Sequence, residues 1–172
     1  MAKTQAQKAA DFEALHKAPG VFVIPNPWDA GSARVLAGLG FKALATTSAG
    51  YARSIGFPDY NAGRENVMAH IRAIAPMIDV PLAADLEDGF GPKPEDCAET
   101  IRQGAEAGLV GGSIEDFTGD RSNPVHSIEA AADRVRAAAE AAGKLPFKFM
   151  LCARAENYLN GRQDLGDTIK RL

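Results

Sequence analysis

Acidic side chains follow several short apolar runs of this sequence. Asp85 and Glu87 follow one such run, and Glu115 ends another. Clustered carboxylates repel one another and lose solvation unless a positive charge joins them. Mg²⁺ prefers oxygen ligands, keeps several waters and needs only one or two protein carboxylates. The three acids therefore favour a Mg²⁺ site, with Mn²⁺ as the alternative ion and water between some acids and the metal. The plainer alternative is that Asp85 caps a turn and Glu115 is a solvated loop acid.

A second group of residues has the chemistry to hold an anion. The stretch 47–51 (TSAGY) offers small residues whose backbone N–H groups could bind a carboxylate or an oxyanion. Taken alone, this stretch is better explained as an ordinary glycine-containing turn between a strand and a helix. Arg154 could bind a carboxylate through two parallel hydrogen bonds. The alternative for Arg154 is an ion pair with Glu156 or Glu115.

The elements that would position these residues follow from the pattern of apolar and polar stretches. Short apolar runs predict strands at residues 21–24, 42–47, 82–85, 110–115 and 147–153. Amphipathic stretches predict helices at residues 4–18, 29–39, 64–78, 94–107 and 127–142, with a further helix that begins at Asp164. A glycine-rich loop is expected after the second strand.

Strands that alternate with helices are typical of a parallel α/β sheet. Doubly wound sheets and barrels share this alternation, so the pattern alone does not choose between them. In both folds the loops after the strands converge at the carboxyl edge of the sheet. The acids and Arg154 are therefore expected to meet at one rim.

Composition and charge narrow the class of protein. The chain has a formal net charge of −3 and lacks a run of Lys or Arg, which argues against nucleic acid or a membrane surface as a partner. No segment approaches the roughly 20 apolar residues of a membrane span. We expect a soluble, cytoplasmic protein.

The histidines and cysteines do not form a recognisable site. His16, His70 and His126 fall in expected helices or helix starts, and we expect surface residues without a metal or triad role. Cys97 and Cys152 fit neither a disulfide framework nor a zinc spacing. Cys97 is expected to pack inside the protein.

Five segments at the expected strand ends form an ordered set. They are PNPWDA at 25–30, TTSAG at 46–50, DLEDGFG at 85–91, IED at 114–116 and ARAE at 153–156. Together they resemble the successive strand-end motifs of the isocitrate lyase/phosphoenolpyruvate mutase superfamily. The acid-x-acid-x-Gly-aromatic-Gly segment is the most specific of the five.

The resemblance implies a (β/α)8 TIM barrel, an α/β fold of which this chain covers roughly the first five βα units. Residues 1–172 then form a single barrel domain. Because such a barrel takes about 250 residues, and an unclosed one leaves two unpaired edges, we expect the sequence to be incomplete at its C-terminus. The alternative is a short protein with an open sheet.

The resemblance also implies a Mg²⁺-dependent enzyme that binds a small α-keto or α-hydroxy acid and stabilises an enolate-like intermediate. Asp85 would be the main metal-site carboxylate, and Glu87 and Glu115 would support the metal directly or through water. Asp59 would be a catalytic residue near the reacting group. Arg154 would contact the oxygens of the substrate and take part in catalysis.

The same resemblance assigns the substrate carboxylate to the stretch after the second strand. Backbone groups of Ser48, Ala49 and Gly50 would hold it, and Tyr51 would line the same substrate site. A homo-oligomer is also implied.

Departures from the superfamily pattern leave several functions open. Isocitrate and methylisocitrate lyases carry a cysteine in the loop after strand four, whereas residues 116–124 contain neither cysteine nor histidine. The gating loop of the phosphonate-forming mutases is not evident either, and Glu87 replaces the commoner aspartate.

We therefore expect a carbon–carbon lyase that acts by C–C cleavage or decarboxylation. The alternatives are a P–C bond enzyme (a phosphonomutase or a phosphonopyruvate hydrolase), a catalytically idle ligand-binding homologue, or an unrelated α/β domain.

Overall fold

The computed structural model describes residues 2–172. Its helices are α1 (Gln5–Lys17), α2 (Ala30–Gly38), α3 (Ser48–Ser54), α4 (Gly63–Ile74), the short 3-10 helix η1 (Ala75–Met77), α5 (Pro94–Ala107), α6 (Ile128–Gly143) and α7 (Leu165–Arg171). Its strands are β1 (Leu44–Ala45), β2 (Leu82–Asp85), β3 (Gly111–Glu115) and β4 (Met150–Arg154). Strands and helices alternate from β1 onward, as the sequence pattern predicts.

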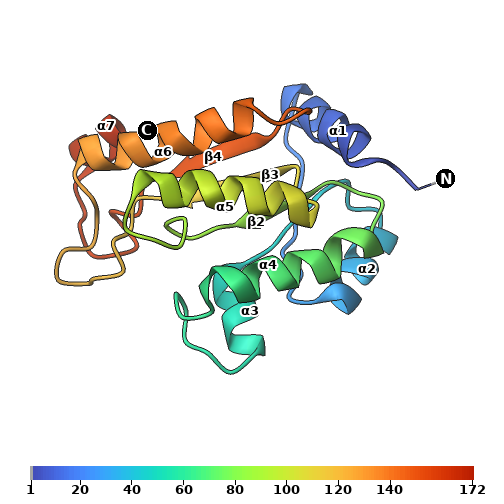
Figure 1. Cartoon of the computed structure of the whole chain (residues 1–172), viewed down its shortest axis with the longest axis horizontal. Coiled ribbons are helices and arrows are strands. Elements are labelled where there is room, and N and C mark those ends of the chain that lie inside the picture. The colour runs from blue at the N-terminus through green and yellow to red at the C-terminus, as the bar shows by residue number, and fades with distance from the viewer. Residues whose placement is uncertain (1) are drawn as a thin grey trace.

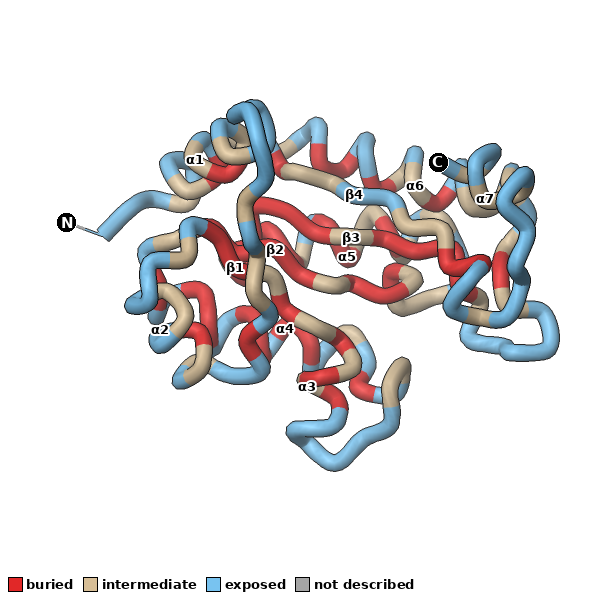
Figure 2. The backbone as a smooth tube through the Cα atoms, turned by 180° about the vertical axis from the view of Figure 1, so that it is seen from behind, coloured by how far each residue is buried: buried red, intermediate tan, exposed pale blue. Residues whose placement is uncertain are grey.

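The four strands form one parallel sheet in the order β1-β2-β3-β4. The register sets Asp85 opposite Ser113 and Glu115 opposite Arg154. Figure 1 shows α4, α5 and α6 on the near side of the strands, and Figure 2 shows the opposite face of the sheet, with α1 at one end. Because the strands are parallel, their carboxyl ends lie at the same edge, which is the edge expected to carry the site.

Strand β2 illustrates how alternation assigns residues to the two faces of the sheet. Leu82 and Ala84 belong to the cluster that packs against the helices, whereas Ala83 belongs to a second cluster with Phe12 of α1. Side chains along a strand point to opposite faces in turn. Asp85 therefore lies on the same face as Ala83, opposite α4 and α5.

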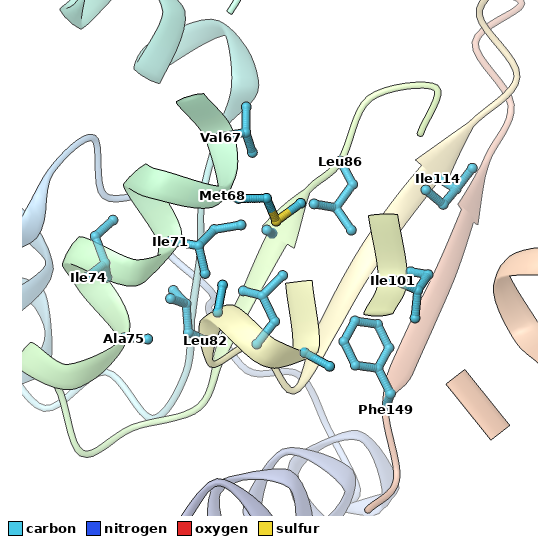
Figure 3. Close-up of a cluster of buried hydrophobic side chains, with 14 of the residues drawn as sticks. Val67, Met68, Ile71, Ile74, Ala75, Leu82, Leu86, Ile101, Ile114 and Phe149 are labelled. Atoms are coloured by element: carbon cyan, nitrogen blue, oxygen red, sulfur yellow. The ribbon is translucent and has the colours of Figure 1, made fainter. Parts of the chain in front are cut away.

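The larger core lies between the sheet and its helices (Figure 3). On α4, Val67, Ile71 and Ile74 recur at the spacing of one helix face, and each is almost fully buried. Helix α5 begins at Pro94, where a backbone N–H would have no partner within the helix, so its absence costs nothing. The helix ends before Gly108, whose φ of 112° lies in the left-handed region. The bounds of β2 and α5 agree with the prediction.

The first predicted strand is wrong. Residues 21–24 are not in a strand, and Val21 and Val23 are 100% and 65% exposed. The segment meets the sheet edge through a backbone hydrogen bond from Ala45 N to Pro25 O (3.2 Å). An apolar run becomes a strand only when a neighbouring strand pairs with it along its length, and β1 is only two residues long here.

The prediction of a glycine-rich loop after the second strand is also wrong at its start, because residues 48–54 form helix α3. Thr47 caps this helix, and its side-chain oxygen accepts a hydrogen bond from Gly50 N. The capping hydrogen bond of Thr47 therefore offsets the low helix propensity of Gly50.

The described helices are too short or too polar to span a bilayer. Across residues 2–172, none has both the length and the apolar character needed to cross a membrane.

Candidate active site

Arg154 lies at the centre of a cluster of carboxylates at the carboxyl edge of the sheet. It ends β4, and its guanidinium reaches Asp85 at the end of β2 (Nη1 to Oδ1, 3.1 Å). It also pairs with Glu115 at the end of β3 and with Glu156 two residues along the chain. The structure thus brings Asp85, Glu115 and Arg154 together at one rim. Both ion pairs that the sequence left as alternatives for Arg154 are present.

Asp85 is also held from the start of α3. Ser48 donates to Asp85 Oδ2 through its hydroxyl (2.6 Å) and through its backbone N–H (3.2 Å). The N–H of Glu87 donates to Asp85 Oδ1 (3.2 Å). The Asp85 carboxylate therefore has a fixed orientation with respect to the first turn of α3.

The predicted anion-binding stretch 47–51 lies beside this carboxylate. Two of its N–H groups already have protein acceptors, since Ser48 N donates to Asp85 and Gly50 N donates to Thr47 Oγ1. Gly50 also lies against Trp28, where a Cβ would come within 2.7 Å of the indole nitrogen. The missing side chain of Gly50 thus allows close approach of the loop that carries Trp28.

Tyr51 and His70 form a stacked pair behind α3. Their ring centroids are 3.9 Å apart with an interplanar angle of 6°, and the Tyr51 hydroxyl donates to Asn66 O. His70 Nε2 lies 3.0 Å from Trp28 O, and burial lowers the pKa of His70. The prediction of a surface histidine at position 70 is therefore wrong, because the ring packs between α4 and the loop that carries Trp28.

Glu87 is a deeply buried acid of the cluster, 3% exposed, like Glu115. Burial raises its pKa to about 8, and the charges of Asp85 and Asp59 act in the same direction. Within the part of the chain that the structure describes, its Oε1 has no hydrogen-bond partner. Its φ of 49° is unusual for a residue with a side chain. A buried carboxylate oxygen without a hydrogen-bond partner could be satisfied by a cation or by a proton.

Glu115 is buried beside Glu87, and its N–H donates to Glu87 O (3.0 Å). Burial raises the pKa of Glu115 to about 7, although hydrogen bonding to Tyr60 and the charge of Arg154 oppose this shift. Tyr60 donates its hydroxyl to Glu115 Oε1. No motif in the sequence selects Tyr60, which follows the predicted catalytic residue Asp59.

Two arginines fix the loop that carries Glu87. Arg64 of α4 donates to the carbonyl oxygens of Gly89 (3.2 Å) and Phe90 (3.1 Å). Arg134 of α6 donates to the carbonyl oxygens of Asp88 and Gly91. Sequence reasoning missed both arginines, because each lies in a helix with no motif around it.

A sequence profile for phosphoenolpyruvate phosphomutase matches residues 12–172. The chain belongs to this family. The resemblance to the isocitrate lyase/phosphoenolpyruvate mutase superfamily is thereby confirmed. The α/β class with a parallel sheet is confirmed as well, and the sheet matches the barrels of solved superfamily members.

Three relatives give the family likeness its detail. A solved protein of Burkholderia cenocepacia J2315, provisionally assigned as a lyase/mutase, is 57% identical with a TM-score of 0.95, over 98% of this chain and 60% of that one. Oxaloacetate acetylhydrolase, solved with its product oxalate, is 30% identical with a TM-score of 0.86, over 98% and 58% of the two chains. The 2-methylisocitrate lyase of Escherichia coli (strain K12) is 31% identical over 68% of this chain and 42% of its own length. The chain thus spans less than two thirds of each relative.

The acids of this phosphomutase-family site have the chemistry to hold Mg²⁺. Asp85, Glu87 and Glu115 offer oxygen ligands, and Arg154 is the positive charge that joins Asp85 to Glu115. Among residues 2–172, no three acid, histidine or cysteine side chains are grouped as a ready-made metal site. One or two carboxylates are enough for Mg²⁺, and the unpartnered Oε1 of buried Glu87 is suited to a cation.

A hollow lies on the face of the sheet opposite α4, α5 and α6, with α1 at one end of it. Its volume is about 530 Å³, its walls include Ala45, Ala83, Gly112 and Cys152, and it extends to Asp85 and Arg154. Larger side chains, among them Phe12, His16 and Met150, form other parts of its wall.

Proposed function

We propose that this protein is a Mg²⁺-dependent lyase that acts on a small 2-keto or 2-hydroxy carboxylic acid, by C–C cleavage or decarboxylation. The observation that carries the proposal is the set of contacts from Arg154 to Asp85 and Glu115, which come from three different strand ends. The likeness to oxaloacetate acetylhydrolase and to 2-methylisocitrate lyase supports the same class of reaction.

Each residue of the cluster has a role that follows from its contacts. Asp85, Glu87 and Glu115 would hold Mg²⁺, directly or through water. When bound, Mg²⁺ supplies positive charge beside the oxygen on which an enolate develops. Ser48 fixes the orientation of Asp85 through its hydroxyl.

Arg154 would bind the oxygens of the substrate. Its guanidinium is a planar fork whose donors match a carboxylate. In the structure these donors face Asp85, Glu115 and Glu156, so a substrate carboxylate would share the guanidinium with them. Asp59 stays our candidate catalytic residue, because its charge is close enough to raise the pKa of Glu87. The backbone groups of residues 48–50, with Tyr51, stay our candidates for the substrate carboxylate.

Chemistry at a P–C bond is the second candidate. It is favoured by the matching family profile, which is that of a phosphomutase, and by residues 116–124, which lack the cysteine of the C–C lyases. Turnover of phosphonopyruvate, without turnover of 2-methylisocitrate, oxaloacetate or a 2-alkylmalate, would replace our first proposal with this one. No turnover of any of these substrates would favour a catalytically idle homologue.

Oxalate provides the first experiment, because it imitates the planar enolate of a keto acid. We expect calorimetry to show oxalate binding that requires Mg²⁺ and is lost in Asp85→Ala. The matched control is Asp133→Ala, an exposed aspartate of α6 that should bind like the native protein. Binding that survives both the removal of Mg²⁺ and Asp85→Ala would rule out the proposed site.

We propose two further properties. The cytoplasmic location stays a prediction from the composition of the chain, and the homo-oligomer stays a prediction from the family resemblance. Sedimentation of the purified protein would test the second of them.

A further inference from the structure

Tyr60 has a backbone conformation that is uncommon for a bulky residue. Its φ is 63°, in the left-handed region that glycine and asparagine normally occupy. In this conformation the N–H of Tyr60 donates to Asp59 Oδ1 (3.1 Å). Strained backbone of this kind persists where surrounding contacts hold it, and it is frequent at functional sites.

The side chain of Tyr60 crosses from its own loop to the end of β3. Its hydroxyl donates to Glu115 Oε1, while Glu115 Oε2 pairs with Arg154. Its ring packs against Phe117, with centroids 4.7 Å apart. Both oxygens of Glu115 therefore have a fixed partner, one from the loop that carries Asp59 and one from β4.

Tyr60 also borders the space next to Glu87. A hollow of about 260 Å³ is lined by Tyr60, Arg64, Glu87 and Gly119. One tyrosine thus connects Asp59 and Glu115 and forms part of the wall beside Glu87. The ring and the hydroxyl make different contacts, so their contributions can be separated by substitution.

We propose that Tyr60 is a positioning residue that acts through Glu115. Its hydroxyl sets the plane of the Glu115 carboxylate, and its backbone orients Asp59 next to the same cluster. This inference rests on the proposed function, because the orientation of Glu115 matters to a ligand only if Glu115 takes part in the site.

The test is oxalate binding in the presence of Mg²⁺, measured by calorimetry. Tyr60→Phe removes the hydroxyl and keeps the ring against Phe117, and it is expected to weaken oxalate binding about tenfold. The control is Tyr158→Phe, an exposed tyrosine whose loss of a hydroxyl should leave oxalate affinity unchanged. Thermal unfolding of both variants should stay close to that of the native protein.

A double-mutant cycle separates a positioning role from a merely structural one. In a Glu115→Gln background, where the tyrosine meets a neutral acceptor, Tyr60→Phe should weaken binding by less than about threefold. Two results would overturn the inference while the proposed function stands. One is that Tyr60→Phe weakens oxalate binding by the same factor in both backgrounds, and the other is that Tyr60→Phe alone does not weaken it. Absence of Mg²⁺-dependent oxalate binding in the native protein would refute the proposed function and this inference with it.

Discussion

Two strand-end loops of this protein are held in opposite ways. The loop after β2, residues 86–92, is fixed from outside by Arg64, Arg134 and Thr100, which donate to its carbonyl oxygens from three different helices. In the loop after β3, residues 117–125, the bonds are mostly internal. Phe117 pairs with Val125, and Thr118 donates to Asn123 O (2.6 Å).

This difference in hydrogen bonding distinguishes the loop after β2, which is held by several helices, from the loop after β3, which is held mainly by itself. The externally fixed loop carries Glu87, a predicted metal-site acid, and its geometry depends on residues far away in the sequence. The internally bonded loop, residues 117–125, depends on few contacts outside itself. Substitutions in it are therefore expected to disturb the acids less than substitutions in the loop after β2.

The largest expected effect is from removing the arginine that fixes the first loop. Arg134→Met leaves the carbonyl oxygens of Asp88 and Gly91 without their donor, and should lower the free energy of unfolding by about 3 kcal/mol. Chemical denaturation measures this. Arg136→Met on the same helix is the matched control, because its side chain is 62% exposed, against 3% for Arg134. Equal losses in the two variants would contradict the special role of Arg134.

The next effect compares one glycine from each loop. Gly89 and Gly119 both have positive φ, 89° and 81°, but a Cβ on Gly89 would lie 2.6 Å from Cys97 Sγ, whereas a Cβ on Gly119 meets nothing within 4 Å. Gly89→Ala should therefore lower the free energy of unfolding by about 3 kcal/mol or less, and Gly119→Ala by about 1 kcal/mol. The same denaturation experiment tests both. A larger loss at Gly119 would show that the second loop is not the more tolerant one.

A third effect is in the pH dependence of stability. Glu87 has a pKa of about 8 in the folded protein, above its ordinary value, so its contribution is full at acid pH and is lost as the pH rises to about 8. Glu87→Gln should therefore show a smaller fall in the free energy of unfolding from about pH 5 to about pH 8 than the native protein does. Denaturation in EDTA across this range measures it.

The loop after β3 contains a control residue, Asp120, whose pKa is shifted in the opposite direction from that of Glu87. Hydrogen bonds from Ser122 lower the pKa of Asp120, so its contribution is lost as the pH falls through the acid range. Asp120→Asn should therefore follow the native curve above about pH 5. Indistinguishable slopes for native protein and Glu87→Gln would mean that Glu87 is ionised in the folded state.

Much of the fold could be predicted because local signals agreed with the packing. The run Leu82–Asp85 and the helix between Pro94 and Gly108 carry both the apolar pattern and the terminal residues of their elements. Residues 21–24 have an equally apolar pattern but form no strand, because pairing along a strand depends on a neighbour that the segment itself does not encode.

The residues of the candidate site could likewise be predicted only where local sequence signals determine their position. Asp85, Glu115 and Arg154 could be selected because parallel strands bring their ends to one edge. Tyr60 could not, since its left-handed backbone and its contact with Glu115 follow from the tertiary structure. Arg134 stands in an alanine-rich helix, and only the fold shows that it faces the loop after β2.

The order of the sheet has a consequence for how the chain is made. Each strand pairs with the strand synthesised just before it, so a new βα unit can dock on an edge that already exists. Synthesis adds about 5–20 residues per second, which is slow compared with the closure of a short loop. In a sheet built in sequence order, each new strand therefore leaves the ribosome after the strand with which it will pair.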